Sequence, residues 1–253
     1  YDFAIPLLKQ IGELAKKYNQ RLTFHPGQFN VLASPNPIAL KHTLDDLEYH
    51  ADVLDLMEMG KDSVMVIHGG GVYKDKPKTI ERWIENYNKL PDKIKNRLVL
   101  ENCERSYNIK DCLYIHEKCG VPVVFDTHHF ECYKILHPDE KFLEPEMYME
   151  DVLNTWELRG IKPKFHVSEQ GAGKCGHHSD YIETMPEYLL IFSKAFAVSS
   201  SCPGFIISVL VDGSNFNIKF FKLSAAEAPA ALIKNSLSSL IFPSTIKIFK
   251  LFI

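Results

Sequence analysis

Several short apolar segments of this sequence end on a side chain that could bind a metal ion. The clearest is V-V-F-D-T-H-H (123–129), in which strand-forming residues are followed by an acid and two histidines. Burying an ionised group costs several kcal/mol unless something compensates its charge, so such an ending calls for a chemical reason. Five successive apolar segments share it, and their terminal residues are His25, His68, Glu101, Asp126 and His166.

A metal centre explains why imidazoles and carboxylates recur at this position. A single histidine of this kind is more often a hydrogen-bonded core residue than a ligand. Five successive segments that all end on a potential metal ligand are hard to explain that way. The mixture of nitrogen and oxygen ligands suits Zn²⁺ or Mn²⁺ better than Ca²⁺ or Mg²⁺, which prefer shells of oxygen atoms. We therefore predict a divalent metal site at which the five segment ends converge.

The segments that carry these residues alternate with helical patterns along the chain. This alternation predicts a parallel sheet, and the apolar strand interiors predict that both of its faces are covered. The predicted helices span 1–18, 37–60, 79–87, 109–120 and 147–157, and the predicted strands span 21–25, 64–68, 97–102, 122–126 and 164–168.

Convergence of five strand ends favours a closed sheet over an open one. An open parallel sheet would space the ends by about 4.8 Å per strand along a line, whereas a barrel directs them toward one axis. In parallel α/β folds the carboxyl ends of the strands form the site of ligand binding and chemistry. The sequence therefore predicts an α/β fold of the (β/α)₈ TIM-barrel type.

Composition limits the classes of partner. The chain has 253 residues and a net charge of -3, so any DNA-binding surface must be a local patch. The six cysteines contain no C-x-x-C pair, and nothing in the sequence marks secretion, so we expect reduced thiols in an intracellular compartment. The sequence shows no signal peptide and no apolar run long enough for a membrane span, so no membrane partner is expected.

The motifs around the predicted ligands resemble those of UV damage endonucleases, DNA repair nucleases related to the endonuclease IV type. The resemblance implies a (β/α)₈ barrel and a metal-dependent enzyme, expected to be a monomer. It would nick double-stranded DNA 5′ to UV photoproducts and related lesions in excision repair. The matching motifs keep their order: F-H-P-G-Q-F (24–29), V-I-H-G-G-G (66–71), L-E-N (100–102), F-D-T-H-H (125–129), K-F-H-V-S (164–168) and H-H-S-D-Y (177–181).

The resemblance also implies up to three divalent ions, with Mn²⁺ expected and Zn²⁺ or Mg²⁺ as alternatives. His25, His68 and Glu101 would hold one ion. Glu101 would bridge it to a second ion, which Asp126 and His166 would also hold. His129 and His178 would hold a third ion. Such a cluster can supply a hydroxide nucleophile near neutral pH. The implied metal ligands are His25, His68, Glu101, Asp126, His129, His166 and His178.

The family pattern assigns further roles outside the ligand set. Lys164 matches a lysine that the family carries in carboxylated form near the metals, so the implied catalytic residues are Glu101, Lys164 and His166. Gln28 and Phe29 match a pair that the family inserts into the DNA helix at the lesion, although tyrosine is common at the position of Phe29. An amide and a flat ring can fill the space that an unstacked dinucleotide leaves.

The match has limits that keep alternatives open. Residues 1–195 are predicted to form the metal-binding barrel core, and the serine-rich segment 196–253 diverges from the family. The family's first strands would precede Tyr1, and its final glutamate-bearing strand is not recognisable, so the barrel is expected to be incomplete. The alternatives are a non-catalytic fragment that still binds metal and a sugar isomerase-like barrel, which would not explain H-P-G-Q-F.

Overall fold

The structure is a computed structural model that describes most of the chain. The described residues are 2–180, 182–184, 186–189, and the short strands at 205–206, 209–212, 215–218 and 251–252. The predicted boundary at residue 195 lies outside them, as does most of the segment 196–253. None of the helices in the described residues is both long enough and apolar enough to cross a membrane.

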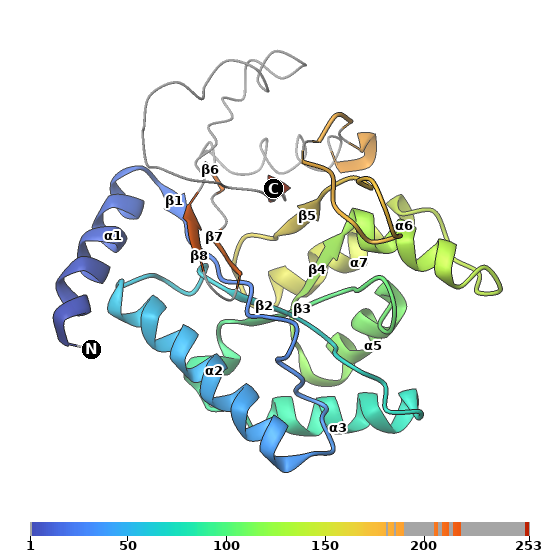
Figure 1. Ribbon diagram of the computed structural model, residues 1–253, viewed down its shortest axis with the longest axis horizontal. Coiled ribbons are helices and arrows are strands. Elements are labelled where there is room, and N and C mark those ends of the chain that lie inside the picture. Colours follow the sequence, from blue (N-terminus) through green and yellow to red (C-terminus); the bar gives the residue numbers. More distant parts are fainter. Residues whose placement is uncertain are drawn as a thin grey trace.

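A parallel sheet in the order β2-β3-β4-β5 forms the centre of the fold (Figure 1). Its strands confirm four of the five predicted strands, with bounds that differ by about one residue at each end. A short strand, β9, pairs with β5 in the antiparallel direction. The bounds are β2 (Met65–His68), β3 (Leu98–Glu101), β4 (Val123–Asp126), β5 (Phe165–Val167) and β9 (Leu251–Phe252).

The strand predicted at 21–25 is shorter in the structure. β1 (Gln20–Arg21) pairs in parallel with β6 (Phe205–Ile206), and Phe24 then makes a single parallel bridge to Met65 of β2. Two backbone hydrogen bonds of 2.9 Å form this bridge, from Phe24 N to Val64 O and from Val66 N to Phe24 O. The segment therefore continues the sheet beyond β2.

A separate hairpin is formed by β7 (Val209–Asp212) and β8 (Asn215–Ile218), which pair with each other.

Helices α1, α2, α3, α5 and α7 form an arc around the strands in Figure 1. All the predicted helices are present, and the short α4 and the longer α6 are additional. The sequence does not predict α6 because its first four residues are all buried and its last two apolar residues, Ile135 and Leu136, are exposed, so it lacks a clear amphipathic pattern. The helices are η1 (Asp2–Ala4), α1 (Ile5–Lys17), α2 (Pro37–Leu56), α3 (Lys76–Asn88), α4 (Asp92–Lys95), α5 (Ile109–Cys119), α6 (Thr127–Leu136) and α7 (Glu146–Glu157).

Both faces of the parallel sheet are buried, as its apolar strands predict. Side chains alternate between the faces along each strand. Met65 and Leu100 join the large core beneath the helices, whereas Val66 and Val99 join a second cluster with Trp156 of α7. The sheet edge that carries the predicted ligands is thus supported from both sides.

Helix α2 ends at Leu56, four residues before the glycine that the sequence suggested as its end. Glu58 adopts a left-handed conformation (φ 54°), and Met59 N donates to Leu54 O at 3.0 Å, which closes the helix. Salt bridges from Lys9 and Lys16 of α1 to Glu58, at 3.3 and 3.5 Å, connect this turn to the neighbouring helix.

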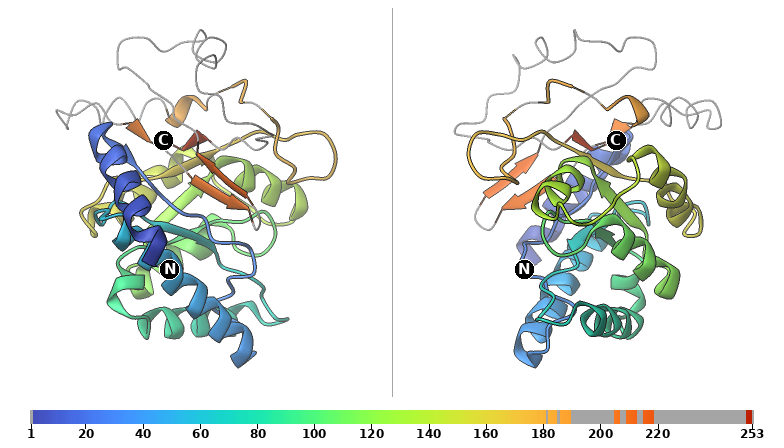
Figure 2. Two further views of the ribbon diagram at one scale, coloured as in Figure 1. Left: turned by 60° about the vertical axis from the view of Figure 1, so that its left-hand side comes forward. Right: turned by 90° about the vertical axis from the view of Figure 1, so that its right-hand side faces the viewer.

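Helix α1 packs on the end of α2 through small residues. Gly12 and Ala15 are buried, whereas Ile11 and Leu14 are exposed although both are large apolar residues. A Cβ atom on Gly12 would overlap the carbonyl group of Met57. The end of α2 therefore approaches α1 closely because position 12 lacks a side chain, and the two helices can be followed in both views of Figure 2.

Candidate metal centre

The register of the parallel sheet brings the predicted ligands to one edge. His68 is paired with Glu101 across β2 and β3, and Asp126 is paired with His166 across β4 and β5. His25 directly follows Phe24, which bridges to β2. Because all of these segments run in parallel, their carboxyl ends form a single cluster. The predicted convergence of five strand ends is therefore present in the structure.

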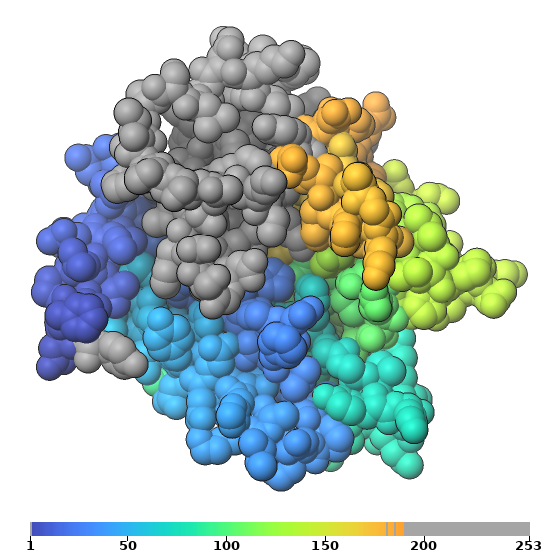
Figure 3. Space-filling model, viewed as in Figure 1, coloured from blue at the N-terminus to red at the C-terminus, as the bar shows by residue number. Residues whose placement is uncertain are grey.

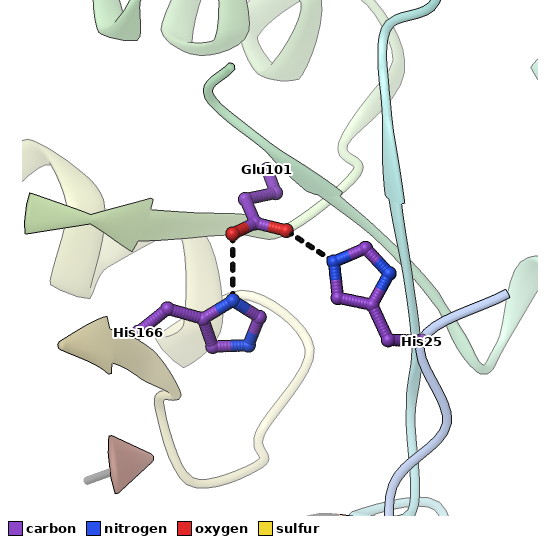
Figure 4. Close-up of side chains that lie close together, drawn as sticks. All are labelled: His25, Glu101 and His166. Carbon is purple, nitrogen blue, oxygen red and sulfur yellow. Dashed lines mark hydrogen bonds and ion pairs between the residues drawn. The ribbon is translucent and has the colours of Figure 1, made fainter. Parts of the chain in front are cut away.

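Glu101 lies at the centre of the cluster. Its Oε2 atom is 2.7 Å from His25 Nε2 and 3.1 Å from His68 Nε2, and its Oε1 atom is 2.6 Å from His166 Nδ1. Figure 4 shows His25 and His166 approaching the two oxygens of this carboxylate from different segments. The Glu101 and His166 side chains are fully buried, so their electrostatic interactions are screened little by water.

Asp126 connects the cluster to helix α6. Its Oδ1 atom accepts a hydrogen bond of 2.8 Å from the backbone N–H of His129, which caps the helix. Its Oδ2 atom lies 3.6 Å from His129 Nδ1 and 3.9 Å from His166 Nδ1. His129 Nδ1 is also 3.6 Å from Glu101 Oε1. The strand end and the helix start therefore place two carboxylates and two imidazoles together.

The sequence prediction did not assign a role to Asn102, which holds Asp126 in place. Asn102 Oδ1 accepts from Asp126 N at 2.8 Å, and Asn102 Nδ2 donates to Asp126 O at 3.0 Å. The carbonyl oxygen of Asn102 is 3.0 Å from His129 Nδ1, which orients that ring. The position of Asn102 directly after Glu101 in L-E-N was the available signal.

His178 lies at the same edge on a loop after β5. Its ring centroid is 5.7 Å from that of His129, and its Nδ1 atom is 2.8 Å from Ser168 Oγ. His177 is exposed, with its Nδ1 atom 3.1 Å from the carbonyl oxygen of Ala172. The adjacent histidines thus differ, because only His178 lies beside the cluster.

His128 packs behind the cluster rather than in its centre. Its ring centroid is 5.0 Å from that of His178, and its Nε2 atom is 3.6 Å from Cys132 Sγ. Burial, followed by a hydrogen bond with Cys175, raises the pKa of the Cys132 thiol to about 12. Without a bound metal, Cys132 is therefore protonated at neutral pH.

Lys164 is only 1% exposed and directly precedes β5, two residues before His166.

Gln28 and Phe29 occupy a turn that follows His25. Asn30 N donates to Gly27 O at 3.0 Å and closes the turn. Gln28 is exposed, and Phe29 is 83% exposed although it is a large apolar residue. The two side chains are therefore available to a partner close to the cluster.

The donor set of this cluster fits a divalent metal. Two triplets have ligand atoms within 4.8 Å of one another, namely His25, Glu101 and His166, and His68, Glu101 and His129. Glu101 belongs to both triplets, which suits a carboxylate that bridges two ions. Imidazole with carboxylate is a ligand set of Zn²⁺ and Mn²⁺.

Replacing Asn102 with alanine tests how the cluster is held. The change leaves the buried N–H and C=O groups of Asp126 without their side-chain partner, so we expect the free energy of unfolding to fall by roughly 2 kcal/mol. We also expect divalent-metal affinity to fall about 10- to 100-fold, as is typical when a ligand loses its support. Chemical denaturation and metal titration measure the two effects. Unchanged metal affinity would contradict the orienting role of Asn102.

The family UV-endonuclease UvdE matches residues 1–193 of the chain. A UV-damage endonuclease of Neurospora crassa is 40% identical over 66% of this chain and 26% of its own length. A UV DNA damage endonuclease of Bacillus velezensis is 36% identical over 72% of this chain and 57% of its own length. The chain thus spans less than two thirds of these relatives.

Two solved structures are also similar to this chain. SacUVDE is 34% identical, with a TM-score of 0.64 over 72% of this chain and 60% of that chain. Endonuclease IV from Thermus thermophilus is 14% identical, with a TM-score of 0.52 over 82% of this chain and 74% of that chain. The second likeness concerns the fold alone, and the parallel strands around the site form part of a (β/α)₈ barrel. With the family match over most of its length, the chain belongs to the UV-endonuclease UvdE family.

Proposed function

We propose that this protein is a divalent-metal-dependent endonuclease that cleaves double-stranded DNA 5′ to UV photoproducts and related lesions, and that it acts as a monomer. The observation that carries the proposal is the buried Glu101 carboxylate with imidazoles on both of its oxygens, at the carboxyl edge of a UvdE-family barrel. Proteins of that family in Neurospora and Bacillus are named as UV-damage endonucleases.

The proposed ligands are the seven residues that the sequence indicated. When bound, Mn²⁺ or a similar divalent ion would lower the pKa of water and stabilise negative charge on a phosphate. Glu101, bordered by His25, His68 and His166, supplies negative charge to offset the repulsion between neighbouring cations. Lys164, which is buried two residues before His166, is the proposed site of a carboxylated lysine near the ions.

Gln28 and Phe29 are the proposed lesion-recognition residues. A base pair distorted by damage costs less to unstack than an intact one, so inserted side chains can select it. The exposed ring of Phe29 offers a stacking surface, and the amide of Gln28 can hydrogen-bond to base edges. Their turn directly follows His25, so a phosphate near the inserted pair would lie close to the cluster.

A nicking assay tests this function. We expect the protein with Mn²⁺ to convert UV-irradiated supercoiled plasmid to the open-circular form, to leave unirradiated plasmid intact, and to lose activity in excess chelator. A duplex with one pyrimidine dimer should be cut on the 5′ side of the lesion. Equal nicking of unirradiated plasmid, or activity that persists in chelator, would contradict the proposal. Metal uptake without any nicking would instead indicate a non-catalytic metal-binding protein.

A further inference from the structure

Side chains of α2 and α3 fix the loop 26–34, which carries Phe29. Gln28 and Phe29 are exposed, but the residues that follow them are held by hydrogen bonds on both sides of Val31. The conformation of the loop is therefore set before any partner binds. The four contacts are Asn30 Nδ2 to Asp46 Oδ2 (2.7 Å), Val31 N to Thr43 Oγ1 (3.0 Å), Asn86 Nδ2 to Leu32 O (2.8 Å) and Arg82 Nε to Ala33 O (2.6 Å).

A second loop, 69–75, packs directly against the first. Gly70 has a φ of 87°, and a Cβ atom placed there would lie 3.2 Å from Val31 Cγ1. The same Arg82 that donates to Ala33 places its guanidinium carbon 5.7 Å from the centre of the Tyr73 ring. The loops 26–34 and 69–75 therefore form one continuous surface, which we call the rim; Figure 3 shows the two segments adjoining on one face.

The backbone of the second loop is strained at the residues that it exposes. Tyr73 and Lys74 have φ angles of 48° and 66°, a left-handed region that non-glycine residues rarely adopt. Thr79 Oγ1 donates to Val72 O at 2.8 Å and helps to hold this conformation. Strain of this kind persists only where the surroundings enforce it, and it is concentrated at functional sites.

The exposed groups of the rim suit a nucleic acid. Tyr73 is 41% exposed, which places a second aromatic ring on the same surface as Phe29. Lys74 is exposed and makes no ion pair within the part of the chain that the structure describes, whereas nearby Lys78 is paired with Asp75 at 3.3 Å. A net charge of -3 means that attraction to DNA must come from local cations of this kind.

We propose that Tyr73 and Lys74 form a second contact with the DNA duplex, Tyr73 by packing its ring on an exposed base and Lys74 by binding a phosphate. Arg82 is the positioning residue, because it holds the Tyr73 ring and the loop of Phe29 in one fixed arrangement. This proposal rests on the proposed function for its ligand, but it concerns binding and requires no metal.

Equilibrium binding in the presence of a chelator tests the contact without strand cleavage. The probe is a short fluorescent duplex with one pyrimidine dimer, followed by anisotropy. We expect Tyr73→Ala to weaken binding roughly ten-fold, since an aromatic–base stack is worth about that much, and Tyr73→Phe to bind as the wild type does. Lys74→Ala should lower the slope of log Kd against log salt by about 1.

Helix α5 provides matched controls. Tyr114 and Lys118 are also an exposed aromatic and a lysine, with Lys118 Nζ 5.2 Å from the Tyr114 ring centre. Tyr114→Ala and Lys118→Ala should leave Kd and its salt dependence unchanged. A loss of affinity in these variants equal to that of the rim variants would show that the effect is not local, and it would overturn the proposal.

Arg82→Lys separates positioning from simple charge. The variant keeps the cation but loses the Nε–H donor to Ala33 O, so we expect Kd to rise several-fold while the melting temperature falls by no more than about 4 °C. In the Tyr73→Ala background the same change should have a smaller effect, because part of the interaction is already absent. Full additivity would refute the coupling between Arg82 and Tyr73.

The failures of this proposal and of the proposed function are distinguishable. If Tyr73→Ala and Lys74→Ala bind DNA as tightly as the wild type, and the wild type nicks irradiated DNA, only the rim contact is refuted. If these variants bind more weakly but the wild type never nicks, the nuclease is refuted and the contact is supported. No duplex binding by the wild type would overturn both.

Discussion

Glu101→Gln is expected to reduce nicking of UV-irradiated DNA by at least about 100-fold and to lower the bound metal. Glutamine keeps the shape of the side chain but removes the charge that faces His25, His68 and His166. Losing a group that merely supports a ligand typically costs about 10- to 100-fold, so losing a bridging carboxylate should cost at least as much. Elemental analysis and the plasmid assay measure the two effects.

A matched control is Glu117→Gln on α5, where the carboxylate is 67% exposed and pairs with Lys118 at the surface. It should retain both metal and activity. Far-ultraviolet circular dichroism should be unchanged in both variants, since each substitution conserves volume. If Glu101→Gln binds as much metal as the wild type, Glu101 is not a ligand and the proposed centre is wrong.

Gly12→Ala is expected to lower the free energy of unfolding by about 3 kcal/mol, which is near the upper end for overpacking in a closely packed region. The added methyl group would overlap the Met57 carbonyl group, and this neighbour is backbone that cannot change rotamer. α1 must move away from α2 or α2 must deform. For a chain of this length the melting temperature should fall by roughly 10 °C.

Gly60→Ala is the control, at an exposed glycine four residues past the end of α2. A Cβ atom at Gly60 meets no atom within 4 Å, so alanine should be tolerated there. We expect its melting temperature to stay within about 2 °C of the wild type, because an alanine that fits restricts mainly the unfolded chain. Equal melting temperatures for the two variants would mean that α1 does not pack on Met57 as closely as the structure has it.

The sequence by itself determined the strands and the chemistry at their ends. Strand interiors of only apolar residues have one stable environment, a sheet covered on both faces, and parallel strands separated by helices place their carboxyl ends at one edge. His68, Glu101, Asp126 and His166 therefore belong together on sequence grounds alone. The order of motifs around them was specific enough to indicate the family.

Only the tertiary structure decided how these side chains meet. Pairing of His68 with Glu101 depends on register between strands that are more than thirty residues apart, which local sequence does not encode. Asn102 acquires its role because two parallel strands place its amide against the Asp126 backbone.

Helix boundaries and helix faces were also decided by tertiary contacts. α6 lacks a clear helical period because its first turn is buried throughout, and α2 ends where the turn at Glu58 meets the lysines of α1. The exposed Ile11 and buried Gly12 of α1 reverse the expectation from hydrophobicity, because close helix approach favours the smallest residue at the contact. Local patterns record which residues are apolar, whereas packing decides which of them face each other.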